Sequence, residues 1–66
     1  MVNQALRDAI AQRYHTESEL ARALGWTKQK LSKTVIGTRN PKISDLNALS
    51  KALDLPVGEV INFFAS

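Results

Sequence analysis

Side chains able to hydrogen-bond with the edges of DNA bases are concentrated between positions 28 and 33. At about 100° per residue, Gln29, Ser32 and Lys33 fall on one side of a helix, with Lys28 at its edge. Lysine can donate to the acceptors of guanine, glutamine can form two hydrogen bonds with adenine, and serine can bond to either base. The same side chains also suit an ordinary solvated helix face, so this stretch alone leaves both interpretations open.

The distribution of charge favours the nucleic-acid interpretation. Positions 28–42 contain five basic residues and no acidic residue: Lys28, Lys30, Lys33, Arg39 and Lys42. Positions 1–27 contain three basic and three acidic residues, and positions 43–66 contain one basic and three acidic residues. The net charge of +3 therefore comes entirely from this window, where a positive field would attract phosphate groups.

Two short helical patterns joined by a tight turn are predicted to carry these side chains. Thr16 can cap the helix expected at positions 17–24, with Glu19 at the capping-box spacing. Gly25 can end that helix in the left-handed conformation, and Thr27 can cap the next helix at once. Two helices joined by a short glycine-containing turn form a helix-turn-helix, whose second helix would place Leu31 toward the core.

The apolar spacing predicts a compact all-α fold in one domain, positions 1–66. Helices are expected at positions 2–14, 17–24, 28–36, 44–53 and 57–64. Asn3 and Ser44 are the predicted N-caps of the first and fourth helices. The residues predicted to face inward from the last two helices are Leu46, Leu49, Ala52, Leu53, Val57, Val60, Ile61 and Phe64. Phe63 falls outside that stripe and is expected to be partly exposed.

The segment after the third helix is polar and basic, and Pro41 stiffens it. Arg39 and Lys42 are predicted phosphate contacts, as is Lys30 on the third helix. The start of the fourth helix, at Ser44, could bind a phosphate through its free backbone N–H groups. The alternative for this loop is a solvated basic segment without a ligand.

Composition argues against catalysis and against metal or cofactor binding. The chain has no cysteine and a single histidine, so no thiolate site or histidine cluster can form. His15 is expected in an exposed connection with no reason to meet Ser32, and no glycine-rich phosphate loop follows a strand. No apolar run approaches the roughly 18 residues of a membrane span, and no signal-peptide pattern is visible, so we expect a cytoplasmic protein.

Two sequence runs resemble the lambdoid phage repressor/Cro (XRE-like) class of helix-turn-helix proteins. The runs are L-A-x-x-L-G-W-T at positions 20–27 and L-x-x-L-S-K-A-L-D-L-P-V at positions 46–57, and the resemblance extends from about Leu6 to Phe64. It implies a lambda-repressor-like five-helix bundle that binds operator DNA, usually as a symmetric dimer, with the third helix in the major groove. By matching position, the residues at or near bases would be Thr27, Lys28, Gln29, Ser32 and Lys33. Those along the DNA backbone would be Glu17, Arg39, Asn40 and Lys42.

This chain departs from that class at three places. Glu17 stands where many members have glutamine, and a phosphate would repel its carboxylate. Ile10 and Val35 occupy positions where some members pair arginine with glutamate, which replaces a buried ion pair by apolar packing. Thr34 replaces a larger apolar residue, and Ile36 stands where a polar residue is common, so Ile36 is expected to be exposed.

Two functions remain open from the sequence. The first is a sequence-specific double-stranded DNA-binding transcription regulator, repressor- or Cro-like, from a phage or bacterium, acting as a homodimer. The alternative is a protein-interaction modulator, antirepressor- or antitoxin-like, that acts by binding a second regulatory protein. Exposed apolar side chains at Ile36, Phe63 and Phe64 motivate the alternative, although they also fit a homodimer built on the last helix.

Overall fold

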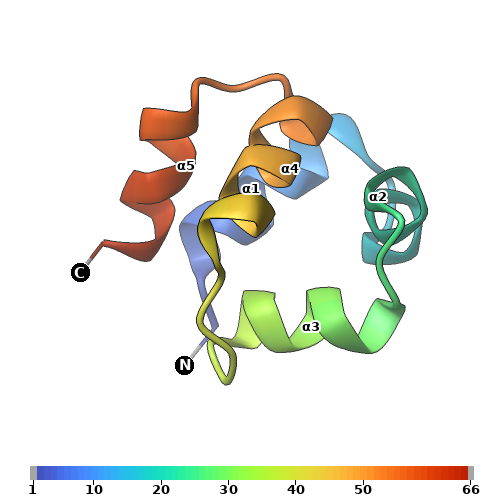
Figure 1. The fold of residues 1–66 in the computed structure, drawn as a ribbon. Coiled ribbons are helices and arrows are strands. Elements are labelled where there is room, and N and C mark those ends of the chain that lie inside the picture. The colour runs from blue at the N-terminus through green and yellow to red at the C-terminus, as the bar shows by residue number, and fades with distance from the viewer. Residues whose placement is uncertain (1, 66) are drawn as a thin grey trace.

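The computed structural model describes residues 2–65, and this part of the chain contains five helices and no strand. They are α1 (Gln4–Arg13), α2 (Glu17–Leu24), α3 (Lys28–Ile36), α4 (Ile43–Leu53) and α5 (Val57–Phe64). Figure 1 shows α4 crossing the centre of the view, with α2 on one side, α5 on the other and α3 along one edge. The predicted all-α five-helix architecture is confirmed. No helix within the described residues is both long and apolar enough to cross a membrane.

The N-caps of α2 and α3 and the tight turn between the two helices form as the sequence predicts. The Thr16 hydroxyl accepts a hydrogen bond from the Glu19 N–H at 3.2 Å, and the Thr27 hydroxyl accepts one from the Lys30 N–H at 3.1 Å. Gly25 ends α2 in the left-handed conformation, with φ of 73°. The chain therefore leaves α2 and enters α3 within three residues, which fixes the two helices relative to each other.

The first helix is shorter than predicted, and its flanking residues tie it to distant parts of the chain. Asn3 is its N-cap, as expected, since the Asn3 side chain accepts from the Leu6 N–H at 3.1 Å. The Asn3 side-chain amide also donates to the Phe63 carbonyl at 2.6 Å. Tyr14 lies beyond the helix in extended conformation, where its hydroxyl donates to the Ala52 carbonyl at 2.8 Å.

The predicted N-cap of α4 is wrong. The helix begins at Ile43, so Lys42 is the N-cap and Ser44 lies within the first turn. The reason is the Asp45 carboxylate, which accepts a hydrogen bond from the Lys42 N–H at 3.0 Å. This bond satisfies one of the backbone donors at the helix start and places that start before Ser44.

The core brings together side chains from all five helices. Its buried apolar members among residues 2–65 are Leu6, Ile10, Leu20, Ala21, Leu31, Val35, Leu49, Leu53 and Val60. Ile10 and Val35 are 3% and 2% exposed, so apolar packing does occupy those two positions. Leu46 and Ala52, predicted to be buried, are only half-buried and pack against the edge of this core.

The inward face of α5 differs from the prediction. Val60 is fully buried, but Val57 and Ile61 are 40% and 46% exposed, and the prediction that they face inward is wrong. Phe63 is half-buried, as expected, and it packs against the core together with Phe64. Five of the eight residues of α5 are large and apolar, so periodicity alone does not select one stripe.

Candidate nucleic-acid interface

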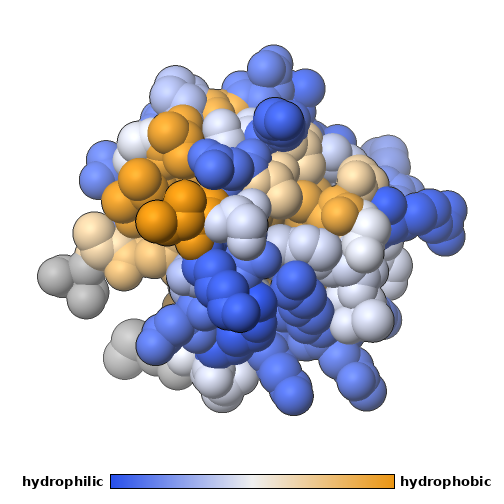
Figure 2. Space-filling model, in the orientation of Figure 1, coloured by the Kyte–Doolittle hydropathy of each residue, from blue (hydrophilic) through white to orange (hydrophobic). Residues whose placement is uncertain are grey.

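The outward face of α3 carries the polar side chains singled out by the sequence. Lys28, Gln29 and Lys33 are exposed, and Ser32 is half-buried. On the opposite face of the helix, Leu31, Thr34 and Val35 are buried. Because α3 lies along one edge of the molecule, its polar face is turned away from the other helices (Figure 1). In the same orientation, Figure 2 shows a predominantly hydrophilic surface along this edge.

Contacts at both ends of α3 fix the rotation of this face. At the start, Thr27 caps the helix through its own hydroxyl. At the end, Gly37 has φ of 95°, and the N–H groups of Gly37 and Thr38 both donate to the Lys33 carbonyl. The Asn3 N–H donates to the Val35 carbonyl at 2.8 Å, which anchors the last turn to the N-terminal segment. These contacts therefore set which side of α3 faces outward.

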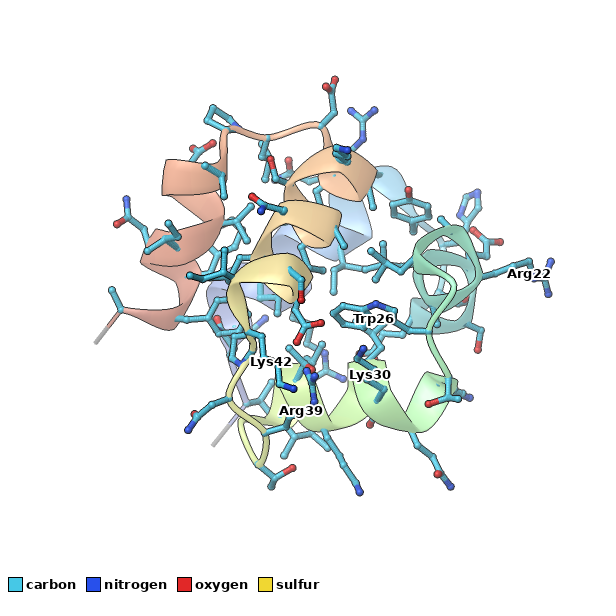
Figure 3. The ribbon with its side chains drawn as sticks, viewed as in Figure 1. Arg22, Trp26, Lys30, Arg39 and Lys42 are labelled. Atoms are coloured by element: carbon cyan, nitrogen blue, oxygen red, sulfur yellow. The ribbon has the colours of Figure 1, made fainter. Side chains whose placement is uncertain are left out.

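The loop between α3 and α4 contributes further polar groups beside this face. Asn40, Lys42 and Ser44 are exposed, whereas Arg39 is half-buried. Figure 3 shows Lys30, Arg39 and Lys42 gathered between α3 and the start of α4, while Arg22 points away from them on α2. The residues predicted to contact phosphate thus come from two adjoining elements.

Two of these cations converge on one carboxylate. The Asp45 side chain is only 7% exposed. Its Oδ2 lies 2.7 Å from Arg39 Nη2, and its Oδ1 lies 3.5 Å from Lys30 Nζ. Arg39 Nη1 also donates to the Thr34 hydroxyl at 3.2 Å, and that hydroxyl donates to the Lys30 carbonyl at 2.9 Å. We use the name Asp45 cluster for this group together with the neighbouring Trp26: Trp26, Lys30, Thr34, Arg39 and Asp45.

The indole ring of Trp26 lies against the two cations of the Asp45 cluster. Lys30 Nζ lies 4.4 Å from the centroid of the Trp26 ring, and Arg39 Cζ lies 5.8 Å from it. Both distances are within the range in which a cation is attracted to the face of an aromatic ring. Figure 3 shows Lys30 rising from α3 toward this ring. Trp26 therefore helps to hold both cations against the protein.

The environment of Asp45 favours its charged form. Burial by itself raises the pKa of this carboxyl, because the charged form loses contact with water. The hydrogen bond from the Lys42 N–H, the Arg39 guanidinium and the Lys30 ammonium act in the opposite direction and outweigh burial. The pKa of Asp45 therefore lies below its ordinary value, and the ion pairs persist at neutral pH.

Sequence reasoning missed the roles of Asp45 and Trp26. Asp45 was counted only among the acidic residues of positions 43–66, and Trp26 appeared only as part of a family-like run. The spacing of Lys42 and Asp45 matches that of an N-cap and a capping acidic residue three positions later, but lysine has no side-chain acceptor and is not a usual N-cap residue. Local sequence therefore favoured Ser44 as the cap, and only the structure shows that the Asp45 carboxylate meets Arg39.

Exposed apolar side chains form a second feature of the surface. Ile36, on the outward side of α3, is 42% exposed, as the sequence predicts. Ile43, Val57 and Ile61 are 77%, 40% and 46% exposed, and we refer to these three residues as the α5 patch. Figure 2 shows apolar surface gathered over α5 and the neighbouring start of α4. The two phenylalanines singled out by the sequence, in contrast, are only half-buried neighbours of the core.

Within residues 2–65, no group of three or more His, Cys, Asp or Glu side chains is placed to hold a metal ion. A family model described as a helix-turn-helix domain matches residues 4–62. No curated protein and no solved structure matches the chain. The family match covers all the interface residues described above.

Proposed function

This chain belongs to the helix-turn-helix domain family, and we propose that it is a sequence-specific regulator that reads double-stranded DNA with α3. The observation that carries the proposal is the exposed polar face of α3 beside a basic loop. An α-helix fits the major groove of B-form DNA, where each base pair presents a distinct pattern of donors and acceptors.

The proposed base-reading residues are Thr27, Lys28, Gln29, Ser32 and Lys33. Gln29 is exposed near the start of α3, which is the part of a recognition helix that contacts base edges first. Lys28 and Lys33 flank it and can reach guanine acceptors. Ser32 is half-buried, so it would contact only a base brought close to the helix surface.

The residues that the sequence predicts to contact phosphate divide into two groups by their environment. Asn40, Lys42 and Ser44 are exposed at the loop and at the start of α4, where the positive end of the helix dipole favours an anion. Lys30 and Arg39 face the same region, but Asp45 holds their charged ends. Glu17, half-buried in the first turn of α2, would be repelled by a phosphate at the matching family position.

We also propose that the protein acts as a homodimer that binds a palindromic operator, like phage or bacterial repressors and Cro proteins. Val57 and Ile61, the members of the α5 patch on α5 itself, offer apolar surface on a different helix from α3, and burying such surface is the main driving force for association. Two α3 helices related by a two-fold axis would read two half-sites about one helical turn apart. A cytoplasmic location is part of the same proposal.

The test is selection of DNA from a labelled, randomised duplex pool, followed by fluorescence anisotropy at two salt concentrations. Enrichment of a palindromic motif, with affinity that falls steeply with salt, is the expected result. Binding without an enriched motif would contradict sequence-specific reading. Absence of salt-dependent binding to any duplex would contradict DNA binding itself.

The exposure of Ile36 and of the α5 patch also favours a second candidate, a modulator that binds another regulatory protein. An apolar residue on the polar face of α3 would suit a protein surface better than a DNA groove. Gel filtration of the protein mixed with a candidate partner regulator tests this function. Co-elution that depends on Ile36 would support it, and separate elution would count against that partner.

A further inference from the structure

The charge that the sequence places at the interface is not all available to DNA. Five basic residues lie between positions 28 and 42, but the charged ends of Lys30 and Arg39 both lie against Asp45. Among residues 2–65, no carboxylate forms an ion pair with Lys28, Lys33 or Lys42. Asp45 thus divides the cations of the interface into a held pair, Lys30 and Arg39, and a free set. The free set consists of Lys28, Lys33 and Lys42.

We propose that Asp45 is a positioning residue that withholds Lys30 and Arg39 from DNA phosphates and so limits sequence-independent affinity. The inference rests on the proposed DNA-binding function. It leaves the neutralisation of DNA charge to the free set of Lys28, Lys33 and Lys42, of which Lys28 and Lys33 lie on the proposed base-reading face and Lys42 in the loop beside it. It also makes Asp45, which touches no DNA, the residue that sets how strongly salt weakens binding.

The geometry of Arg39 explains why its guanidinium stays in place. Both terminal nitrogens have partners: Nη2 donates to Asp45 and Nη1 donates to the Thr34 hydroxyl. Thr34 is 1% exposed and is itself bonded to the Lys30 carbonyl, so this acceptor is fixed in position. Moving Arg39 to a phosphate would break both bonds and leave a buried carboxylate without its closest partner, which is costly.

Lys30 is held less tightly than Arg39, but the Asp45 carboxylate and the Trp26 ring both draw its ammonium group toward the protein. Its Nζ lies 3.5 Å from the Asp45 carboxylate and 4.4 Å from the centre of the Trp26 ring. The side chains of Lys30 and Arg39 are 36% and 25% exposed, so both have a path to solvent. Removing the charge of Asp45 would therefore release two cations that already lie beside the proposed DNA surface.

Salt dependence measures this effect directly. Each phosphate neutralised on B-form DNA contributes about 0.9 to the slope of log affinity against log salt concentration. Asp45→Asn retains an oxygen that can accept the Lys42 N–H bond but removes the charge. We expect this variant to bind a random-sequence duplex more tightly at low salt, with a slope steeper by up to about 1.8 per protomer if both cations reach phosphates.

The matched control is Asp54→Asn. It changes the net charge by the same amount, but Asp54 is exposed at the end of α4 and its only ion pair in the described residues is a 3.8 Å contact with Arg13. Asparagine tolerates the left-handed conformation that Asp54 adopts. An equal steepening in both variants would mean a general effect of net charge and would overturn the proposal.

Reversal and charge-removal variants complete the experiment, with folding of each variant checked by circular dichroism. Adding Arg39→Gln to Asp45→Asn should return the slope toward the wild-type value. In the wild-type background, Lys30→Gln should leave the slope unchanged, whereas Lys42→Gln should lower it by about 0.9. The Lys30→Gln result does not depend on whether Asp45→Asn folds.

Three outcomes would overturn the proposal while leaving DNA binding intact. The first is a lower slope in Asp45→Asn, which would mean that Asp45 aims the two cations at phosphates. The second is a slope in Asp45→Asn equal to that of the wild type. The third is a loss of about 0.9 in the slope of Lys30→Gln. A wild-type protein with no salt-dependent binding would instead contradict the proposed function.

Discussion

At the scale of single residues, Gln29 has the clearest proposed role in reading sequence. It is exposed in the first turn of α3, and an amide can bond adenine through both a donor and an acceptor. We expect Gln29→Ala to weaken binding to the selected operator by roughly 1–3 kcal/mol and to relax the preference at one base pair. Anisotropy with the operator and its single-base variants measures both effects.

Gln12→Ala is the matched control, since Gln12 is an exposed glutamine on α1. It should leave operator binding unchanged. If Gln29→Ala weakened operator and random DNA equally, Gln29 would be a general contact and its proposed reading role would be wrong.

Asp45 also makes the stability of the fold depend on pH. Its pKa is below the ordinary value in the folded protein, so the unfolded chain binds a proton more readily. The stabilisation from its pairing with Arg39 and Lys30 is therefore fully present above the unfolded-state pKa and is lost as pH falls through the folded-state pKa. We expect urea unfolding, followed by fluorescence of the neighbouring Trp26, to show this loss in acid.

The comparison that checks this prediction is the difference in stability between wild type and Asp45→Asn as a function of pH. The difference should be largest at neutral pH and should shrink in acid, because the asparagine variant has no charge to lose. As a control at neutral pH, Asp54→Asn should change stability little, since its ion pair is exposed and long. A constant difference across pH would contradict a role for the Asp45 charge.

At the scale of elements, the turn between α2 and α3 depends on the backbone conformation of Gly25. Its φ is 73°, and a Cβ built there would meet no atom within 4 Å. A side chain at position 25 would therefore strain the backbone but would not clash with another atom. We expect Gly25→Ala to lower the free energy of unfolding by about 1–2 kcal/mol, measured by chemical denaturation.

Gly58→Ala is the control for Gly25→Ala. Gly58 lies in α5, and a Cβ there would also meet no atom within 4 Å, but its φ is not positive. Alanine has a higher helix propensity than glycine, so this variant should be neutral or more stable by up to about 1 kcal/mol. Equal destabilisation by both changes would show that the sign of φ at Gly25 is not the cause.

At the scale of the whole molecule, the α5 patch is the proposed contact between two copies of the chain. Ile61→Ser should shift the protein toward the monomer in sedimentation without DNA, because it removes apolar surface from that contact. Ile36→Ser is the matched control, since Ile36 has similar exposure but lies on α3. Dissociation caused by Ile36→Ser instead would place the contact on α3 and contradict the proposed dimer.

Local patterns in the sequence were sufficient to predict several features correctly. The caps at Thr16 and Thr27 and the left-handed Gly25 depend on neighbours within a few positions, and the helical period indicated Leu31 as the side of α3 that other helices would bury. The capping interactions are closed within a single helical turn, so no distant contact alters them. The family was likewise recognisable, and the helix-turn-helix match over residues 4–62 confirms it.

The start of α4 and the inward face of α5 could not be predicted in this way. The start of α4 at Ile43 depends on a carboxylate that is itself held by Arg39 and Lys30. In α5, whose residues are mostly apolar, the contacts with other helices select Val60 over Ile61 for burial.

By itself the sequence determined the five helices, the turn at Gly25 and the polar face of α3, because period and capping are local properties. It also determined the total charge between positions 28 and 42. Only the tertiary structure decided which of those charges are free, because it brings the buried Asp45 within 2.7 Å of Arg39 and 3.5 Å of Lys30. Net charge follows from the sequence, but whether a cation can bind a phosphate depends on the charged groups that lie beside it in the fold.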